Sequence, residues 1–138
     1  MSSSYSSLSR QRDNKYDEKR SCERRIRNIE EDLRRLRSAK NVVSDVKSDI
    51  SNLANKTRSG FNDLSNWQGQ EYNWAKGCGT DQISNDTIKY RNDADRILDR
   101  LCDEITRLEN ERRKNQGLLG SIVNAINDLG NAIEKLFN

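Results

Sequence analysis

Two long stretches of this sequence carry apolar residues at steps of three and four, and this spacing constrains the fold more than any other feature. The first stripe runs through Ile26, Ile29, Leu33, Leu36, Ala39, Val43, Val46, Ile50, Leu53 and Thr57. The second runs through Ile83, Thr87, Tyr90, Ala94, Ile97, Leu101, Ile105, Leu108, Arg112, Asn115, Leu119, Ile122, Ile126, Leu129, Ile133 and Leu136. Such steps place side chains on one face of an α-helix. The sequence therefore predicts two long helices, each with one apolar stripe.

Only 32% of the chain is apolar and 34% is charged. That is too little apolar residue for a thick globular core, but enough for a seam between two helices. Disorder is the alternative for so polar a chain. The regular stripes argue against it, because thirteen of the sixteen positions in the second stripe are apolar.

A glycine-rich segment separates the two stripes. Residues 59–80 contain four of the seven glycines and both tryptophans: Gly60, Trp67, Gly69, Trp74, Gly77 and Gly79. Glycine weakens helices and favours reversals of the chain. We therefore predict an all-α fold, a long antiparallel coiled-coil-like hairpin in a single domain spanning residues 1–138. Its helices are expected at about 10–58 and 81–136, joined by a turn at 59–80.

Trp67 and Gly69 are assigned to the bend, where the indole covers the open end of the helix pair. Gly117 and Gly120 raise a separate question about the second helix. They predict either a kink, a break before a short third helix, or a close approach of helices at small residues. The spacing does not distinguish these three.

The last twenty residues carry more apolar surface than the rest. Under antiparallel pairing they lie opposite residues 3–23, which offer few apolar side chains. We therefore predict that a second chain binds this segment and buries its apolar surface. The predicted partner-binding residues are Leu119, Ile122, Ile126, Leu129, Ile133 and Leu136. The alternative is a kink that folds this segment back onto the hairpin. Binding at a membrane interface is less favoured, because the polar face carries Asn rather than Lys or Arg.

The sequence offers no pattern for chemistry or for metal binding. Histidine is absent, and Cys22, Cys78 and Cys102 have no C-x-x-C spacing. We expect three free thiols, no enzyme activity, no catalytic or metal site and no cofactor. The longest uncharged run, residues 115–127, is too short to cross a membrane.

Arginine is abundant in the first helix, which raises the question of nucleic-acid binding. Acids interleave these arginines, as in the i,i+4 pairs Glu30–Arg34 and Glu31–Arg35. Such pairs stabilise an exposed helix face. No aromatic platform accompanies them, so we expect no nucleic-acid partner.

Trp67-Gln68-Gly69 between two long helices resembles the WXG superfamily, the ESAT-like hairpins of type VII secretion. The whole chain is more similar to the YwqH-like small proteins found beside LXG toxins in Gram-positive bacteria. That similarity runs through residues 26–50, the Trp67-Gln68-Gly69 bend, residues 105–110 and residues 126–133.

This resemblance implies a non-enzymatic adaptor or targeting chaperone that binds the helical N-terminal region of an LXG toxin, with a second small helical protein as a further partner. The superfamily's export signal, Tyr-x-x-x-Asp/Glu, is not found. Tyr90, for example, has Ala94 at the position four residues later, where the signal has an acidic residue. We expect a cytoplasmic protein, and export with its partner stays open. The alternative function is a self-associating coiled-coil structural protein, a homo-oligomer that buries the same face.

Overall fold

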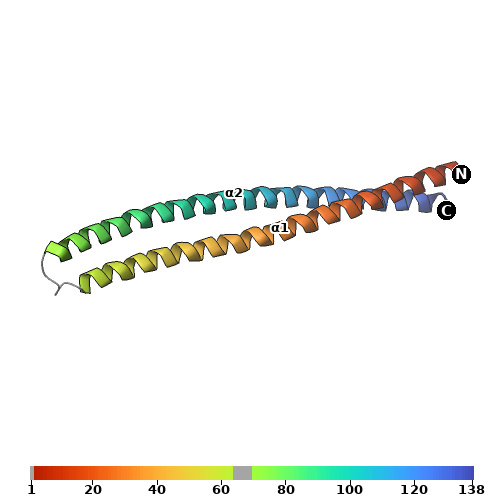
Figure 1. Cartoon of the computed structure of the whole chain (residues 1–138). Helices are drawn as coiled ribbons and strands as arrows, with labels where there is room; N and C mark the ends of the chain where they lie inside the picture. Colours follow the sequence, from red (N-terminus) through yellow and green to blue (C-terminus); the bar gives the residue numbers. More distant parts are fainter. Residues whose placement is uncertain (1, 64–69) are drawn as a thin grey trace. The chain divides into compact units, whose positions relative to one another are not determined.

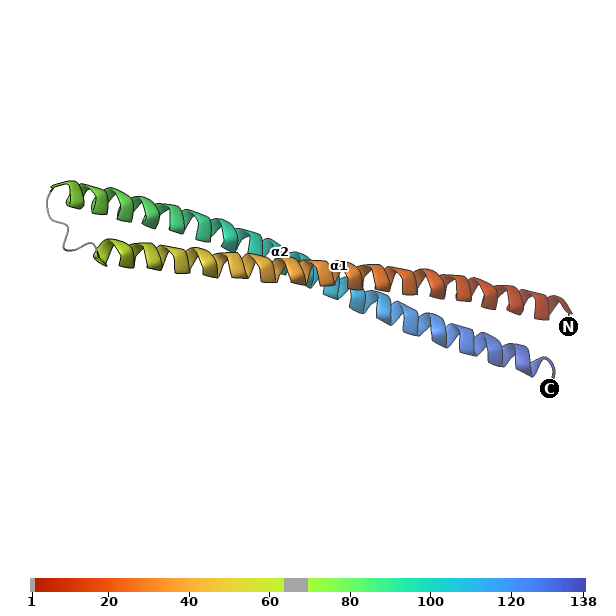
Figure 2. The same cartoon turned by 60° about the horizontal axis from the view of Figure 1, so that its bottom comes forward.

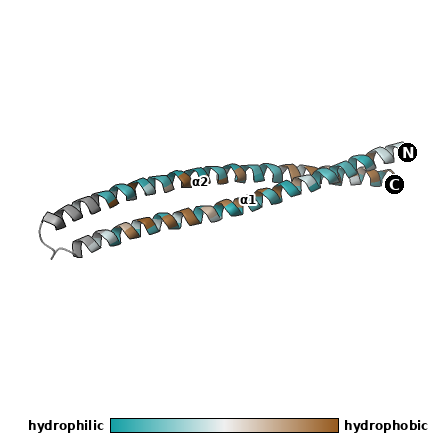
Figure 3. Ribbon diagram, in the orientation of Figure 1, coloured by the Kyte–Doolittle hydropathy of each residue, from teal (hydrophilic) through white to brown (hydrophobic). Residues whose placement is uncertain are grey.

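The computed structural model describes residues 2–63 and 70–138, and within them all side chains except those of residues 2, 58, 61–63, 70–76 and 78–81. Two helices make up the fold: α1 (Ser2–Asp63) and α2 (Gln70–Lys135). Figures 1 and 2 show them running antiparallel as the two arms of a hairpin. Figure 3 shows hydrophobic residues recurring between hydrophilic ones along both helices. The predicted all-α hairpin is confirmed.

Both helices are longer than the sequence suggested. α1 begins at Ser2 rather than near residue 10, and α2 begins at Gln70 rather than near residue 81. Gly60 and Gly77, assigned to the turn, therefore lie within helices. A glycine inside a helix lowers helix stability by about 1 kcal/mol but leaves the backbone hydrogen bonds intact. Only proline removes such a hydrogen bond, and the chain contains no proline, so the helices can continue through these glycines. The predicted bend residues Trp67 and Gly69 lie outside the described residues.

α2 continues without a break through Gly117 and Gly120. A third helix after Gly117 is therefore not formed. Apart from its chain neighbours and its own helix backbone, a methyl group added at either glycine would meet no atom within 4 Å. Close helix approach is thus not the reason for glycine at these two positions, and both are simply weak points of a continuous helix.

Gly117→Ala and Gly120→Ala are each expected to raise the free energy of unfolding by about 1 kcal/mol. Alanine has the higher helix propensity and also restricts the unfolded chain, and both sites have room for the methyl group. Urea unfolding followed by circular dichroism measures the change. A loss of stability in either variant would contradict the open surroundings described here.

Contacts divide the chain into two compact units. Unit 1 joins Met1–Arg35 to Ile105–Asn138, and its seam is built from large apolar side chains. The buried set is Cys22, Ile26, Leu33, Ile105, Leu108, Ile122, Ile126 and Ile133. The ends of the two helices also meet in this unit, where the rings of Tyr5 and Phe137 pack edge to face with centroids 5.5 Å apart.

Unit 2 is the segment Leu36–Glu104 and has a different seam. Among its described residues, the buried side chains are all small: Ala54, Thr87 and Ala94. An ion pair from Lys47 to Asp95 joins α1 to α2 here. Larger apolar side chains are present in this unit but do not lie at the centre of its seam.

Candidate partner-binding surface

The six residues predicted to contact a partner lie in the seam of unit 1. Ile122, Ile126 and Ile133 are buried, and the other three are half-buried. Ile122 and Ile126 form a cluster with Cys22 and Ile26 of α1. Another chain can therefore reach the three buried isoleucines in this structure only after α1 moves away.

The polar first part of α1 packs beside the apolar end of α2, although it contains few apolar residues. Arg12, Lys15 and Lys19 are half-buried and precede Cys22 at steps of three and four. Long basic side chains can pack their aliphatic stems on apolar surface while the charge stays in water. The buried Cys22 thiol also donates a hydrogen bond to the carbonyl oxygen of Asn115, at 3.2 Å. Unit 1 therefore closes much of its own apolar surface.

Of the ten large apolar side chains that are exposed among the described residues, six lie in unit 2 and four, including Phe137 at 72%, lie in unit 1. Val42 is 61% exposed, Leu53 66% and Tyr90 55%, and Val46 and Ile97 are about half exposed. The sequence had assigned all of these except Val42 to the seam. Small or charged neighbours occupy the more protected positions: Lys47 beside Val46 and Ala54 beside Leu53.

These five side chains form one surface, which we call the unit 2 apolar face: Val42, Val46, Leu53, Tyr90 and Ile97. Spacings of four and seven keep the three α1 residues on one stripe, and a spacing of seven does the same for Tyr90 and Ile97 on α2. Leu53 and Tyr90 line the same groove, so the two stripes border a common opening between the helices.

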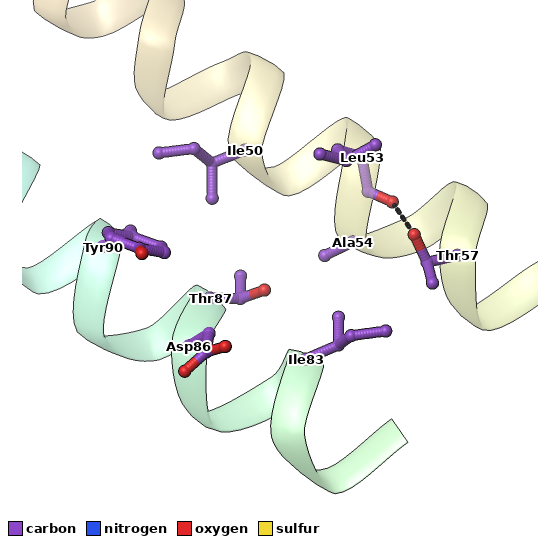
Figure 4. Close-up of a pocket in the computed structure, with 8 residues that line it drawn as sticks. All are labelled: Ile50, Leu53, Ala54, Thr57, Ile83, Asp86, Thr87 and Tyr90. Atoms are coloured by element: carbon purple, nitrogen blue, oxygen red, sulfur yellow. Dashed lines mark hydrogen bonds between the residues drawn. The ribbon is translucent and has the colours of Figure 1, made fainter. Parts of the chain in front are cut away.

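The groove in the unit 2 apolar face has a volume of about 270 Å³. Its lining residues come from both helices: Ile50, Leu53, Ala54, Thr57, Ile83, Asp86, Thr87 and Tyr90. Figure 4 shows Ala54 and Thr87 between the helices, with Ile50 and Ile83 beside them. The Thr57 hydroxyl donates to the carbonyl oxygen of Leu53, so it adds little polarity to the groove.

The other edge of unit 2 is polar. Ser44, Lys47, Ser48 and Ser51 follow one another on α1 at steps of three and four, and they line a separate shallow depression together with Leu98 of α2. The Lys47–Asp95 ion pair lies on this edge. Unit 2 thus has one apolar and one polar edge.

The described residues offer neither a candidate metal-binding group nor a candidate membrane span. They contain no group of three His, Cys, Asp or Glu side chains placed to hold a metal ion. Within that part of the chain, no helix is both long and apolar enough to cross a bilayer. Cys22 and Cys102 are free thiols, while the side chain of Cys78 is outside the described set.

The sequence reasoning missed the unit 2 apolar face, although a signal for it was present. Val42 lies off the predicted stripe, four residues before Val46, and Leu53 follows seven later. Val42 adds an apolar position beside that stripe, and it widens the apolar arc of α1 beyond what one neighbouring helix covers.

Comparison with known proteins gives one match. No curated protein and no solved structure is significantly similar to this chain. The sequence model of the YwqH-like family matches residues 10–131, which is most of the chain and includes the unit 2 apolar face. Both helices of the hairpin lie largely within the matched range. The chain belongs to the YwqH-like family.

Proposed function

We propose that this protein is a non-enzymatic adaptor that binds a helical segment of another protein through the unit 2 apolar face. The observation that supports this most directly is the exposure of Val42, Leu53 and Tyr90 on one surface. Burying a Leu side chain fully is worth about 1.5–3 kcal/mol, so several exposed neighbours favour a covered state. Contiguous apolar patches commonly mark protein contacts.

The partner we propose is the helical N-terminal region of an LXG toxin, which the adaptor keeps ready for type VII secretion. This identity follows from the resemblance of the sequence to YwqH-like proteins, together with its membership of that family. Binding takes place in the cytoplasm under this proposal, and a second small helical protein completes the complex. Catalysis has no part in it.

Leu53→Asp is expected to weaken binding of the LXG toxin N-terminal region by more than about tenfold. The substitution removes apolar contact area and places a carboxylate where the complex excludes water. Leu53 is 66% exposed, so the helix content of the isolated chain should hardly change. Co-expression with an LXG toxin fragment, followed by affinity measurement and circular dichroism, tests this.

Leu118→Asp is the matched control, because Leu118 is 46% exposed but lies in unit 1. It should leave binding unchanged. Equal loss in both variants would place the contact elsewhere, and a wild-type chain that does not bind the toxin fragment would refute the proposed partner. A wild-type homodimer that Leu53→Asp dissociates would favour a self-associating structural protein instead.

A further inference from the structure

We propose that the groove of unit 2 receives one amphipathic helix, which places a large aliphatic side chain over Ala54 and Thr87 and a Lys or Arg beside Asp86. This inference rests on the proposed function and specifies the chemistry of the partner. It follows from three properties of the groove: its floor, its direction and its charge.

The floor of the groove is made of small side chains. Ala54 is 5% exposed and Thr87 8%, yet both line an opening of about 270 Å³. Larger side chains stand around them, with Ile50 and Leu53 on α1 and Tyr90 on α2 (Figure 4). A small floor between large walls is the shape into which a Leu or Ile from a neighbouring helix packs as a knob into a hole.

The direction of the groove favours a helix over an extended peptide. Its lining residues span Ile50–Thr57 on α1 and Ile83–Tyr90 on α2, two helical turns on each. The apolar face continues from there to Val42, so its whole length on α1 is about 22 Å, or four turns. A third helix satisfies its own backbone hydrogen bonds along this length. An extended chain would leave its N–H and C=O groups unpaired against two helices.

The charge of the groove indicates a basic side chain on the partner. Among the described lining residues, Asp86 is the charged one, and the Gln82 side-chain amide approaches both of its carboxylate oxygens at 3.4 Å. Asp93 lies seven residues on, and Arg96 already binds it at 2.6 Å. A Lys or Arg beside the apolar stripe of the incoming helix would meet Asp86 at the edge of the groove, where the covering helix reduces solvent screening.

A second copy of this chain fits the groove less well than a single helix does. Symmetric association through the unit 2 apolar face would set two grooves opposite one another, each with a floor of Ala54 and Thr87. Small side chains would then face small side chains and leave voids between the two copies. Voids forfeit van der Waals contacts and so weaken the association. A single helix presents a ridge, which is the complementary shape.

Ala54→Leu tests the floor. The added side chain occupies the groove, so affinity for the partner helix should fall about tenfold or more. Enlarging a buried position can itself cost about 1–3 kcal/mol, so circular dichroism first establishes that the variant remains folded. Ser51→Leu is the control, because it adds similar apolar bulk on the polar edge of the same helix.

The ligands for both tests are two synthetic amphipathic helices of about 21 residues, each with a stripe of leucines. In one peptide Lys residues flank the stripe, and in the other Glu residues do. Fluorescence anisotropy reports their affinities.

Asp86→Lys tests the charge. The wild-type chain should bind the Lys-flanked peptide at least about fivefold more tightly, and Asp86→Lys should reverse that preference. Asp99→Lys is the control, since Asp99 is an exposed carboxylate of α2 that does not line the groove. Equal affinities for the two peptides, no binding of either, or indifference to Ala54→Leu would overturn the proposal.

These experiments test two hypotheses separately: that a helix binds in the groove, and that the partner is an LXG toxin. If the LXG toxin fragment binds and neither Ala54→Leu nor Asp86→Lys affects it, the groove proposal fails while the adaptor function stands. If the peptides behave as expected and the toxin fragment does not bind, the groove stands and the proposed partner is wrong. A wild-type dimer that Ala54→Leu dissociates would show that a second copy occupies the groove, and would overturn the single-helix proposal.

Discussion

Leu33→Ala is expected to lower the free energy of unfolding by about 3 kcal/mol, among the largest effects of any single truncation in this chain. Leu33 has no exposed surface, and it is one of the two largest fully buried side chains among the described residues. Truncation removes its transfer free energy and leaves a cavity that neighbouring helices fill only in part. A denaturant titration followed by circular dichroism measures the change.

Leu53→Ala is the matched control on the same helix. The sequence places both leucines on the predicted stripe, but Leu53 is 66% exposed. Its truncation should cost less than about 1 kcal/mol. Similar losses at the two positions would mean that Leu53 is covered in the isolated chain, and the unit 2 apolar face would then not be open.

Ile126→Asp is expected to destabilise unit 1 by more than about 3 kcal/mol, because it buries a carboxylate without a partner. Ile126 is 8% exposed and packs in the cluster with Cys22, Ile26 and Ile122. Thermal unfolding by circular dichroism should show an earlier transition and a loss of helix at temperatures where the wild type is folded. Any loss of partner binding in this variant would follow from that unfolding.

Leu118→Asp is the corresponding control, since Leu118 is 46% exposed on the same helix. It should change stability by about 0.5 kcal/mol or less. If Ile126→Asp instead keeps its full helix content and melting temperature while losing a partner, then Leu119–Leu136 is a contact surface after all. That result would support the reasoning from apolar excess at the end of the chain.

The fold class was predictable because helical periodicity is a local property. Steps of three and four place Leu33 and Ile126 on helix faces whatever their surroundings. Antiparallel pairing about the predicted turn also placed the start of the first helix opposite the end of the second. The Cys22–Asn115 hydrogen bond, the Lys47–Asp95 ion pair and the Tyr5–Phe137 contact all agree with this.

The helix ends were not predictable from local preference alone. The first helix was expected from about residue 10, yet α1 begins at Ser2. Its first turns lie beside the end of α2, where the ring of Tyr5 packs against that of Phe137. Such tertiary contact stabilises a helix more than propensity does, and propensity was the only local guide at this end.

The periodicity of the sequence by itself determined that this chain forms two helices with apolar stripes, and hence an antiparallel hairpin. Only the tertiary structure decided which stripe residues are buried. A heptad stripe allows either of two adjacent residues, such as Val46 or Lys47 and Leu53 or Ala54, to point into the seam. The rotation of each helix about its axis makes that choice, and it depends on packing against the other helix. In unit 2 that packing favours the smaller seam residue Ala54 and leaves Leu53 exposed at the edge of the groove.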